Sequence, residues 1–199
     1  MLLFSKQKKE SRGLSLIEAS MVLALSAIVV SGVLYYYNNA SSNRKLVDDA
    51  KTIQMVISTI RTLYENQKQG TIIDANAVAK SGNFTTTTSK NGKTGIVMPT
   101  GETLSIINGS GTGLSAGRLY AIDFYTKDKN ICSHLASVKY GTSHFATEVV
   151  ASKDSVTLVN NLLAKPATDR YLTVSNAAEK CAKLIGSSGQ VRVYMAFKG

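Results

Sequence analysis

The first third of the chain carries one long helical pattern that begins apolar on all sides. From Leu14 to Tyr37 the only charged residue is Glu18, and the uncharged stretch from Ala19 to Tyr37 is nineteen residues long. An α-helix of that length rises about 28 Å, close to the hydrocarbon thickness of a bilayer. The pattern therefore predicts a membrane-spanning helix with Glu18 near its start.

Beyond the apolar run the helical period continues, but only one face stays apolar. Its apolar positions are spaced alternately by four and three residues, which is one stripe of an α-helix. They are Leu46, Ala50, Ile53, Ile57, Ile60 and Tyr64. The polar residues between them are expected on the other faces: Asp48, Asp49, Lys51, Gln54 and Arg61. Since no proline or glycine lies between Val33 and Gln69, we expect one helix from Leu14 to Gln69, about 84 Å long.

The remaining residues, 70–199, have the length of one globular domain. Strands are predicted over Leu119–Tyr125 and Val191–Phe197. A hairpin is predicted over Gly95–Ile107, where Pro99-Thr100-Gly101 supplies turn chemistry. The rest of 70–117 is rich in Thr, Ser, Asn and Gly, which indicates loops with short strands.

Two short helices are expected late in the chain, around Ile131–Val138 and Asn176–Ile185. In the second, Asn176 is placed to cap the start and Gly186 to end the helix. Each of these helices carries one of the two cysteines.

Those cysteines, Cys132 and Cys181, follow a predicted membrane segment, which favours one disulfide formed outside the cytoplasm. The alternative is two unpaired buried thiols. A bridge would close a loop of about fifty residues, worth roughly 4 kcal/mol in the chain-entropy model.

Charge orients the predicted anchor. The formal net charge is +10, and the first thirteen residues contribute four cations and one anion to it. The positive-inside rule then leaves the N-terminus in the cytoplasm and carries the domain across the membrane. A cleaved signal peptide is the competing interpretation, but Ala40-Ser41-Ser42 is a weak cleavage site and the apolar run is longer than a usual signal-peptide core. No dense Lys/Arg patch with interleaved aromatics appears, so no specific nucleic-acid partner is expected.

Catalytic and metal motifs are weak. Gly113-Leu114-Ser115-Ala116-Gly117 matches the nucleophile-elbow pattern, but a strand-like segment follows it where a helix is needed. His134 and His144 are the only histidines, and neither belongs to a close-spaced set of metal-ligand type. We therefore expect no enzyme activity, no cofactor and no metal. A signal-anchored monomeric binding protein or hydrolase, with Ser115 as its catalytic candidate, is kept as the alternative from another class.

A peptidase cut between Gly13 and Leu14 would explain why the charged Glu18 lies in an apolar segment. Glu18 is then the fifth residue of the mature chain, and the cut creates an amine about 6 Å from it along the helix axis. A positive terminus in a membrane or a packed core needs an opposite charge, which Glu18 can supply to its own chain or to a neighbouring one.

The segment KKESRG followed by LSLIEASMVLALSAIVVSG resembles the N-terminus of type IV prepilins. With leucine at position 14, the expected first residue of the mature chain, the segment resembles class b of these prepilins. The stretch through Tyr37 resembles the bundlin group, the subunits of bundle-forming pili. The resemblance covers roughly Lys8–Ala50 and the two cysteines. It implies an α+β type IV pilin fold: a long helix whose hydrophobic half protrudes, an amphipathic half packed on an antiparallel sheet, and a D-region bounded by Cys132 and Cys181.

The domains implied are a cleaved leader (1–13), a transmembrane and filament-core segment (14–37), the amphipathic half of the helix (38–69) and a globular head (70–199). The resemblance also implies N-methylation of Leu14, Glu18 as an assembly charge, and a homopolymeric filament on a Gram-negative surface that serves adhesion and bundling. Implied partners are the prepilin peptidase and methyltransferase, an inner-membrane platform, an assembly ATPase and an outer-membrane secretin, with host cells or neighbouring pili contacting the exposed face. A minor pilin or a type II secretion pseudopilin shares the N-terminal pattern.

Overall fold

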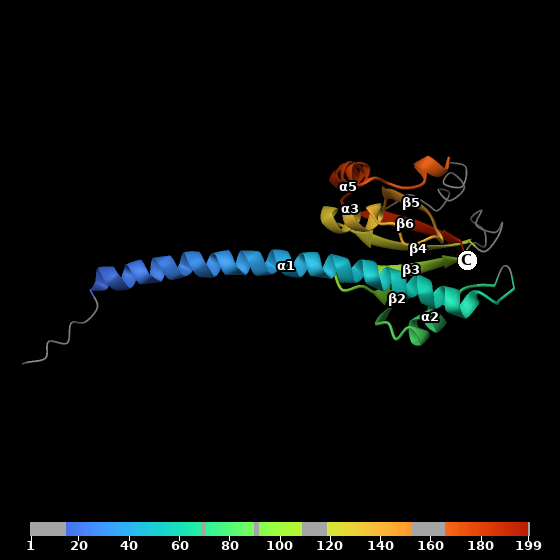
Figure 1. Cartoon of the computed structure of the whole chain (residues 1–199), viewed down its shortest axis with the longest axis horizontal. Helices are drawn as coiled ribbons and strands as arrows, with labels where there is room; N and C mark the ends of the chain where they lie inside the picture. The colour runs from blue at the N-terminus through green and yellow to red at the C-terminus, as the bar shows by residue number, and fades with distance from the viewer. Residues whose placement is uncertain (1–14, 69–70, 90–91, 109–118, 153–165, 199) are drawn as a thin grey trace, which may run out of the picture. The chain divides into compact units, whose positions relative to one another are not determined.

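The computed structural model describes residues 15–68, 71–89, 92–108, 119–152 and 166–198. The chain divides after Ser42 into two units, which are taken one at a time below. Its elements in chain order are α1 (Leu16–Tyr64), α2 (Ala75–Ser81), β1 (Thr86–Thr88), β2 (Thr94–Val97), β3 (Thr103–Asn108), β4 (Leu119–Thr126), α3 (Lys129–Ser137), β5 (His144–Ala151), the 3-10 helix η1 (Ala167–Asp169), α5 (Val174–Ser188) and β6 (Val191–Lys198) (Figure 1).

The helix α1 is continuous over 49 residues and belongs to both units. It starts with Glu18 in its first turn, where a carboxylate complements the helix dipole. It ends at Tyr64, so the predicted end at Gln69 was wrong by five residues. Residues 65–67 form turns instead, and the backbone N–H of Asp74 then donates to the Tyr64 hydroxyl at 2.8 Å.

The second unit is built on a six-stranded antiparallel sheet in the order β1-β2-β3-β4-β6-β5. The predicted hairpin is confirmed: β2 pairs with β3, with Ile96 opposite Leu104 and Gly101 at a φ of 96° in the turn. The two predicted strands are confirmed as β4 and β6, which pair along their whole length at the centre. β5, the edge strand beside β6, was not predicted.

The apolar stripe of α1 forms part of the main core. Ile53, Ile57 and Ile60 are buried as predicted, and Leu46, Ala50 and Tyr64 are half-buried. They pack in one cluster with the side chains that β4 and β6 turn toward them, among them Phe124 and Met195. One assignment was wrong: Asp49, expected on a solvent face, is completely buried.

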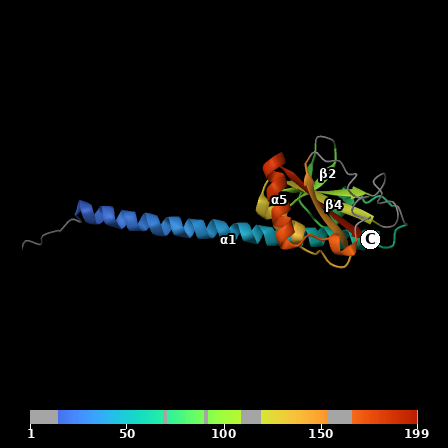
Figure 2. The same cartoon turned by 90° about the horizontal axis from the view of Figure 1, so that it is seen from above.

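The two late helices are longer than predicted and lie side by side next to β5 and β6 (Figures 1 and 2). In α3, the Asp128 side chain accepts hydrogen bonds from the backbone N–H groups of Asn130 and Ile131, which fixes the start at Lys129. The expected cap at Asn176 was wrong, since Thr173 caps α5 and accepts from the Asn176 N–H. Gly186 lies inside α5; Gly189 ends it, because the left-handed φ of 73° there suits glycine.

A further short helix, α2, interrupts the segment predicted as loop. The Asp74 carboxylate accepts from the Asn76 N–H at 2.9 Å and so caps it. Asn108 at the end of β3 holds the chain just before it, because its side chain accepts from Ile73 N and donates to Ile73 O.

Candidate functional site

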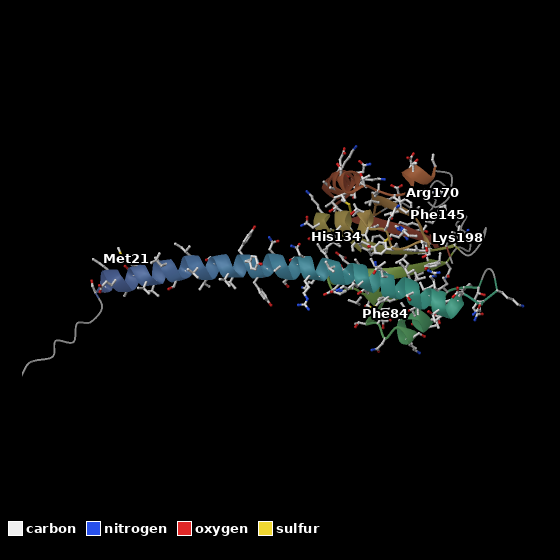
Figure 3. The ribbon with its side chains drawn as sticks, viewed as in Figure 1. Met21, Phe84, His134, Phe145, Arg170 and Lys198 are labelled. Carbon is white, nitrogen blue, oxygen red and sulfur yellow. A yellow bond between two sulfur atoms is a disulfide. The ribbon has the colours of Figure 1, made fainter. Side chains whose placement is uncertain are left out.

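The apolar half of α1 exposes all of its large side chains. From Leu16 to Tyr37 the exposed fraction of its large apolar side chains, which Met21 illustrates in Figure 3, runs from 56% at Val30 to 88% at Leu16. The helix is long and apolar enough to cross a membrane, by length and composition. Soluble monomers rarely leave such a continuous apolar surface uncovered. This segment is therefore the strongest candidate for an interaction surface.

Glu18 lies at the start of this surface and caps its own helix. One carboxylate oxygen, Oε2, accepts a hydrogen bond from the backbone N–H of Ser15 at 3.0 Å, as in the second half of a capping box. An otherwise unsatisfied backbone donor of the first turn gains a partner in this way. Gly13 and Leu14 lie outside the described residues, so the geometry of the expected cut is not part of this site.

The serines of the apolar half bond within the helix. The hydroxyls of Ser20, Ser26 and Ser31 donate to the carbonyls of Ile17, Val22 and Ala27 at 2.7–2.8 Å. A hydroxyl that is satisfied locally adds little cost when the surface around it is buried in an apolar medium. The apolar half therefore carries polar atoms without needing outside partners for these serines.

The second candidate region lies between the two cysteines. Cys132 in α3 and Cys181 in α5 are joined by a disulfide and are both completely buried in the main core. The predicted bridge is confirmed. On the same helix α5, Lys180 forms an ion pair with the buried Glu148 of β5, and burial lowers the pKa of Lys180. The disulfide and this ion pair together fasten α5 to α3 and to the edge strand.

Asp49 ties α1 to the β2–β3 turn. Its Oδ2 accepts from the Thr100 hydroxyl at 2.6 Å and its Oδ1 from the Thr100 backbone N–H at 3.1 Å. Burial raises the pKa of Asp49, and the two Thr100 hydrogen bonds only partly oppose this. The sequence held a signal for the burial of Asp49, though not for its partner, because Asp49 precedes the buried Ile53 by four residues and so shares its helix face.

A second buried carboxylate lies on the other face of the sheet. Asp123 of β4 pairs with Arg192 of β6, and Tyr194 is the cross-strand neighbour of Asp123. Burial raises the pKa of Asp123, and the Arg192 charge opposes it. The same face of the sheet also carries three small apolar side chains, Ala121, Ala146 and Ala196, which are fully or almost fully buried.

The Thr147 hydroxyl lies 2.8 Å from Nε2 of His144, and both side chains are buried. The backbone N–H of Tyr140 donates to Nδ1, which places the proton of the neutral ring on Nε2 and leaves no free ring nitrogen to accept the hydroxyl proton. Of the two histidines, His134 is exposed, and His144 is buried against the rings of Tyr140, Tyr171 and Phe197. Burial lowers the pKa of His144 to about 4. Ser115 of the nucleophile-elbow match lies outside the described residues. A groove beside α1 is lined by hydroxyl, amide and charged side chains but by neither histidine; its residues are Gln54, Ile57, Ser58, Arg61, Thr62, Glu65, Tyr140, Gly141 and Ser143.

No group of three or more His, Cys, Asp or Glu side chains that could hold a metal ion occurs among the described residues.

Comparisons with known proteins agree on one family. The sequence model of the family described as bundlin matches residues 38–198. Two curated relatives, each the "Major structural subunit of bundle-forming pilus", come from Escherichia coli O111:H- and Escherichia coli O127:H6; each is 32% identical over 193 residues, covering 94% of this chain and 96% of the relative.

A solved structure, the type IVb pilin from Salmonella typhi, has a similar fold. It superposes with a TM-score of 0.52 at 12% sequence identity, covering 76% of this chain and 98% of the other. The α+β architecture with its long N-terminal helix, antiparallel sheet and C-terminal disulfide is thus that of a type IVb pilin. By sequence, the chain belongs to the bundlin family.

Proposed function

We propose that this chain is the major structural subunit of a type IVb pilus of the bundle-forming kind. In this proposal it polymerises through α1 into an extracellular filament that serves adhesion and bundling. It has a structural role and no catalytic one. The names of the relatives favour a major subunit over a minor pilin or a secretion pseudopilin.

The observation that carries the proposal is the exposed apolar half of α1. No residue of its most apolar eighteen-residue window is buried in the monomer. At about 25 cal/mol per Å² of apolar surface, leaving such a helix in water is strongly unfavourable. Lipid covers it while the subunit is anchored in the inner membrane, and other copies of α1 cover it in the filament core.

Maturation prepares this surface for assembly. We infer that the prepilin peptidase cuts between Gly13 and Leu14 and that Leu14 is then N-methylated. Cleavage removes the basic leader and leaves an amine one residue before Ser15, whose N–H Glu18 already binds. Since Ser15 occupies Oε2, the second oxygen of Glu18 is the one that we assign to the amine of a neighbouring subunit. The assembly platform, ATPase and secretin act on this matured form.

Intact mass spectrometry of the membrane and filament forms tests the maturation. We expect loss of residues 1–13 and one added methyl group on Leu14. A chain that retains Met1–Gly13 in filaments contradicts the proposal.

Glu18→Ala tests the assembly charge, with electron microscopy of surface filaments as the readout. We expect processing to continue while filaments disappear. Ser15→Ala is the matched control, because it keeps the backbone N–H that binds Glu18, and it should assemble. Normal piliation by Glu18→Ala is the outcome that rejects the role assigned to Glu18.

A further inference from the structure

Three consecutive tyrosines end the apolar half of α1. Tyr35, Tyr36 and Tyr37 are 75%, 76% and 69% exposed. Consecutive residues of an α-helix are about 100° apart around its axis, so the three rings point in three different directions. Within the described part of the chain, no hydrogen bond involves their phenol groups. We call these three residues the tyrosine collar.

The collar differs from the other polar groups of this segment. The hydroxyls of Ser20, Ser26 and Ser31 are satisfied by carbonyls of the helix itself. A phenol on a helix surface projects away from the backbone and has to find its partner outside. Without one, moving a hydroxyl from water into an apolar medium costs roughly 2–7 kcal/mol. The ring itself, however, favours an apolar neighbour, so the collar fits a boundary between water and hydrocarbon.

The position of the collar along α1 matches such a boundary. From Leu16 to Tyr35 the helix rises about 28 Å, close to the hydrocarbon thickness of about 30 Å. From Glu18 to Tyr36 it rises about 27 Å. A bilayer that has the collar at one interface therefore has the Glu18 carboxylate near the other.

The sequence after the collar continues the change from apolar to polar. Asn38 and Asn39 follow at once, and the first charges beyond the collar are Arg44 and Lys45. These cations lie about 10–12 Å further along the helix, beyond the hydrocarbon and at the depth of the headgroups or outside them. Basic residues at that level are attracted to anionic lipid phosphates.

We propose that the tyrosine collar is a lipid-binding site at the membrane–water interface. In the anchored subunit its phenols donate hydrogen bonds to headgroup oxygens and interfacial water on the non-cytoplasmic side, while its rings contact the upper acyl chains. The helix then places Glu18, and the expected cut before Leu14, at the cytoplasmic side. This inference rests on the membrane-anchored state of the proposed function.

Tryptophan fluorescence tests the depth of the collar, because the chain contains no tryptophan. Three single variants of the full-length chain give the reporters: Leu25→Trp in the middle of the apolar half, Tyr36→Trp in the collar and Met55→Trp on an exposed position of the second unit. Each is reconstituted into vesicles of phosphatidylethanolamine and phosphatidylglycerol. The lipids carry bromine, which quenches tryptophan on contact, either next to the headgroup or near the end of the acyl chain.

We expect the quenching maximum to move from the deep bromine for Leu25→Trp to the shallow bromine for Tyr36→Trp, with no quenching of Met55→Trp. Because all three use the same reporter, an interfacial preference of tryptophan alone would make Leu25→Trp shallow as well. Deep quenching of Tyr36→Trp, or none, overturns the inference; the second result leaves the collar in water, available to a neighbouring subunit. If Leu25→Trp is not quenched either, the membrane anchor of the proposed function fails instead.

Discussion

Replacing Asp49 separates the two roles of its carboxylate, which are to accept hydrogen bonds and to carry a charge. Both of its oxygens accept from Thr100, at 2.6 and 3.1 Å, while the side chain is completely buried. Burial raises the pKa of Asp49 above its ordinary value. The acceptors therefore stabilise the folded state, whereas the charge costs it free energy.

Asp49→Ala removes both acceptors and leaves the Thr100 N–H and hydroxyl without them. A hydrogen bond to a charged group contributes about 1.5–3 kcal/mol, so we expect the free energy of unfolding to fall by about 3 kcal/mol after partial rehydration of Thr100. Asp49→Asn keeps one oxygen for the Thr100 N–H and offers an N–H₂ group to the hydroxyl oxygen. Since it also removes the buried charge, we expect a change within about 1 kcal/mol.

Urea denaturation of the full-length protein in detergent, followed by circular dichroism, measures both changes. A carboxyl whose folded pKa is raised adds stability below its unfolded pKa and loses it as the pH rises through the folded pKa. The free energy of unfolding of Asp49→Asn should therefore rise relative to that of the wild type at neutral pH, and this difference should vanish in acid. Glu179→Ala is the control, because Glu179 is an exposed carboxyl of α5 that is not among the groups shifting the pKa of Asp49, and exposed charges contribute little to stability. If Asp49→Asn destabilises the protein as much as Asp49→Ala, the reasoning is refuted.

Three further predictions concern the second unit. Cys132→Ala/Cys181→Ala should lower the free energy of unfolding by roughly 4 kcal/mol under oxidising conditions; equal urea midpoints for variant and wild type would contradict this. Because the pKa of His144 is lowered to about 4, the folded state should lose up to about 3 kcal/mol as the pH falls from 6.5 toward 4, and His144→Gln should remove this part of the acid sensitivity in urea titrations. Arg192→Met should cost about 3–5 kcal/mol by leaving Asp123 buried and unpaired, while Asp123→Leu/Arg192→Met should recover most of that loss; a double variant no better than the single one would argue against the pairing.

The long helix and the central strands could be predicted because their patterns are local. The stripe containing Ile53, Ile57 and Ile60 repeats with the helical period, and β4 and β6 are short runs rich in β-branched and aromatic residues. The β2–β3 hairpin could be predicted for the same reason, because its turn is specified by the adjacent residues Pro99-Thr100-Gly101. The disulfide required only the count of two cysteines and a compartment outside the cytoplasm.

The features that sequence reasoning missed depend on partners far along the chain. Asp49 can be buried because Thr100, 51 residues away, donates a hydrogen bond to each of its carboxylate oxygens. β5 was missed because His144 and Glu148 interrupt its apolar pattern, yet both are buried. The ring of His144 stacks on the ring of Phe197, and the carboxylate of Glu148 pairs with Lys180 of α5, so each buried polar side chain has a partner from another element. A polar residue at a core position cannot be assigned to the core before its partner is known.

In the proposed function the apolar half of α1 is surrounded first by lipid and then by other copies of α1, and its polar atoms are arranged in a way that suits both environments. In lipid, and later among other copies of α1, a polar group without a partner is costly. The three serines bond to their own helix, and Glu18 holds the Ser15 N–H while one of its oxygens stays available. The segment can therefore leave the bilayer and enter a filament core without exchanging any of these bonds. Among the described residues, the Glu18 carboxylate at one end and the tyrosines at the other are the groups that we expect to find new partners, so the proposed assembly changes polar contacts mainly at the two ends of the segment.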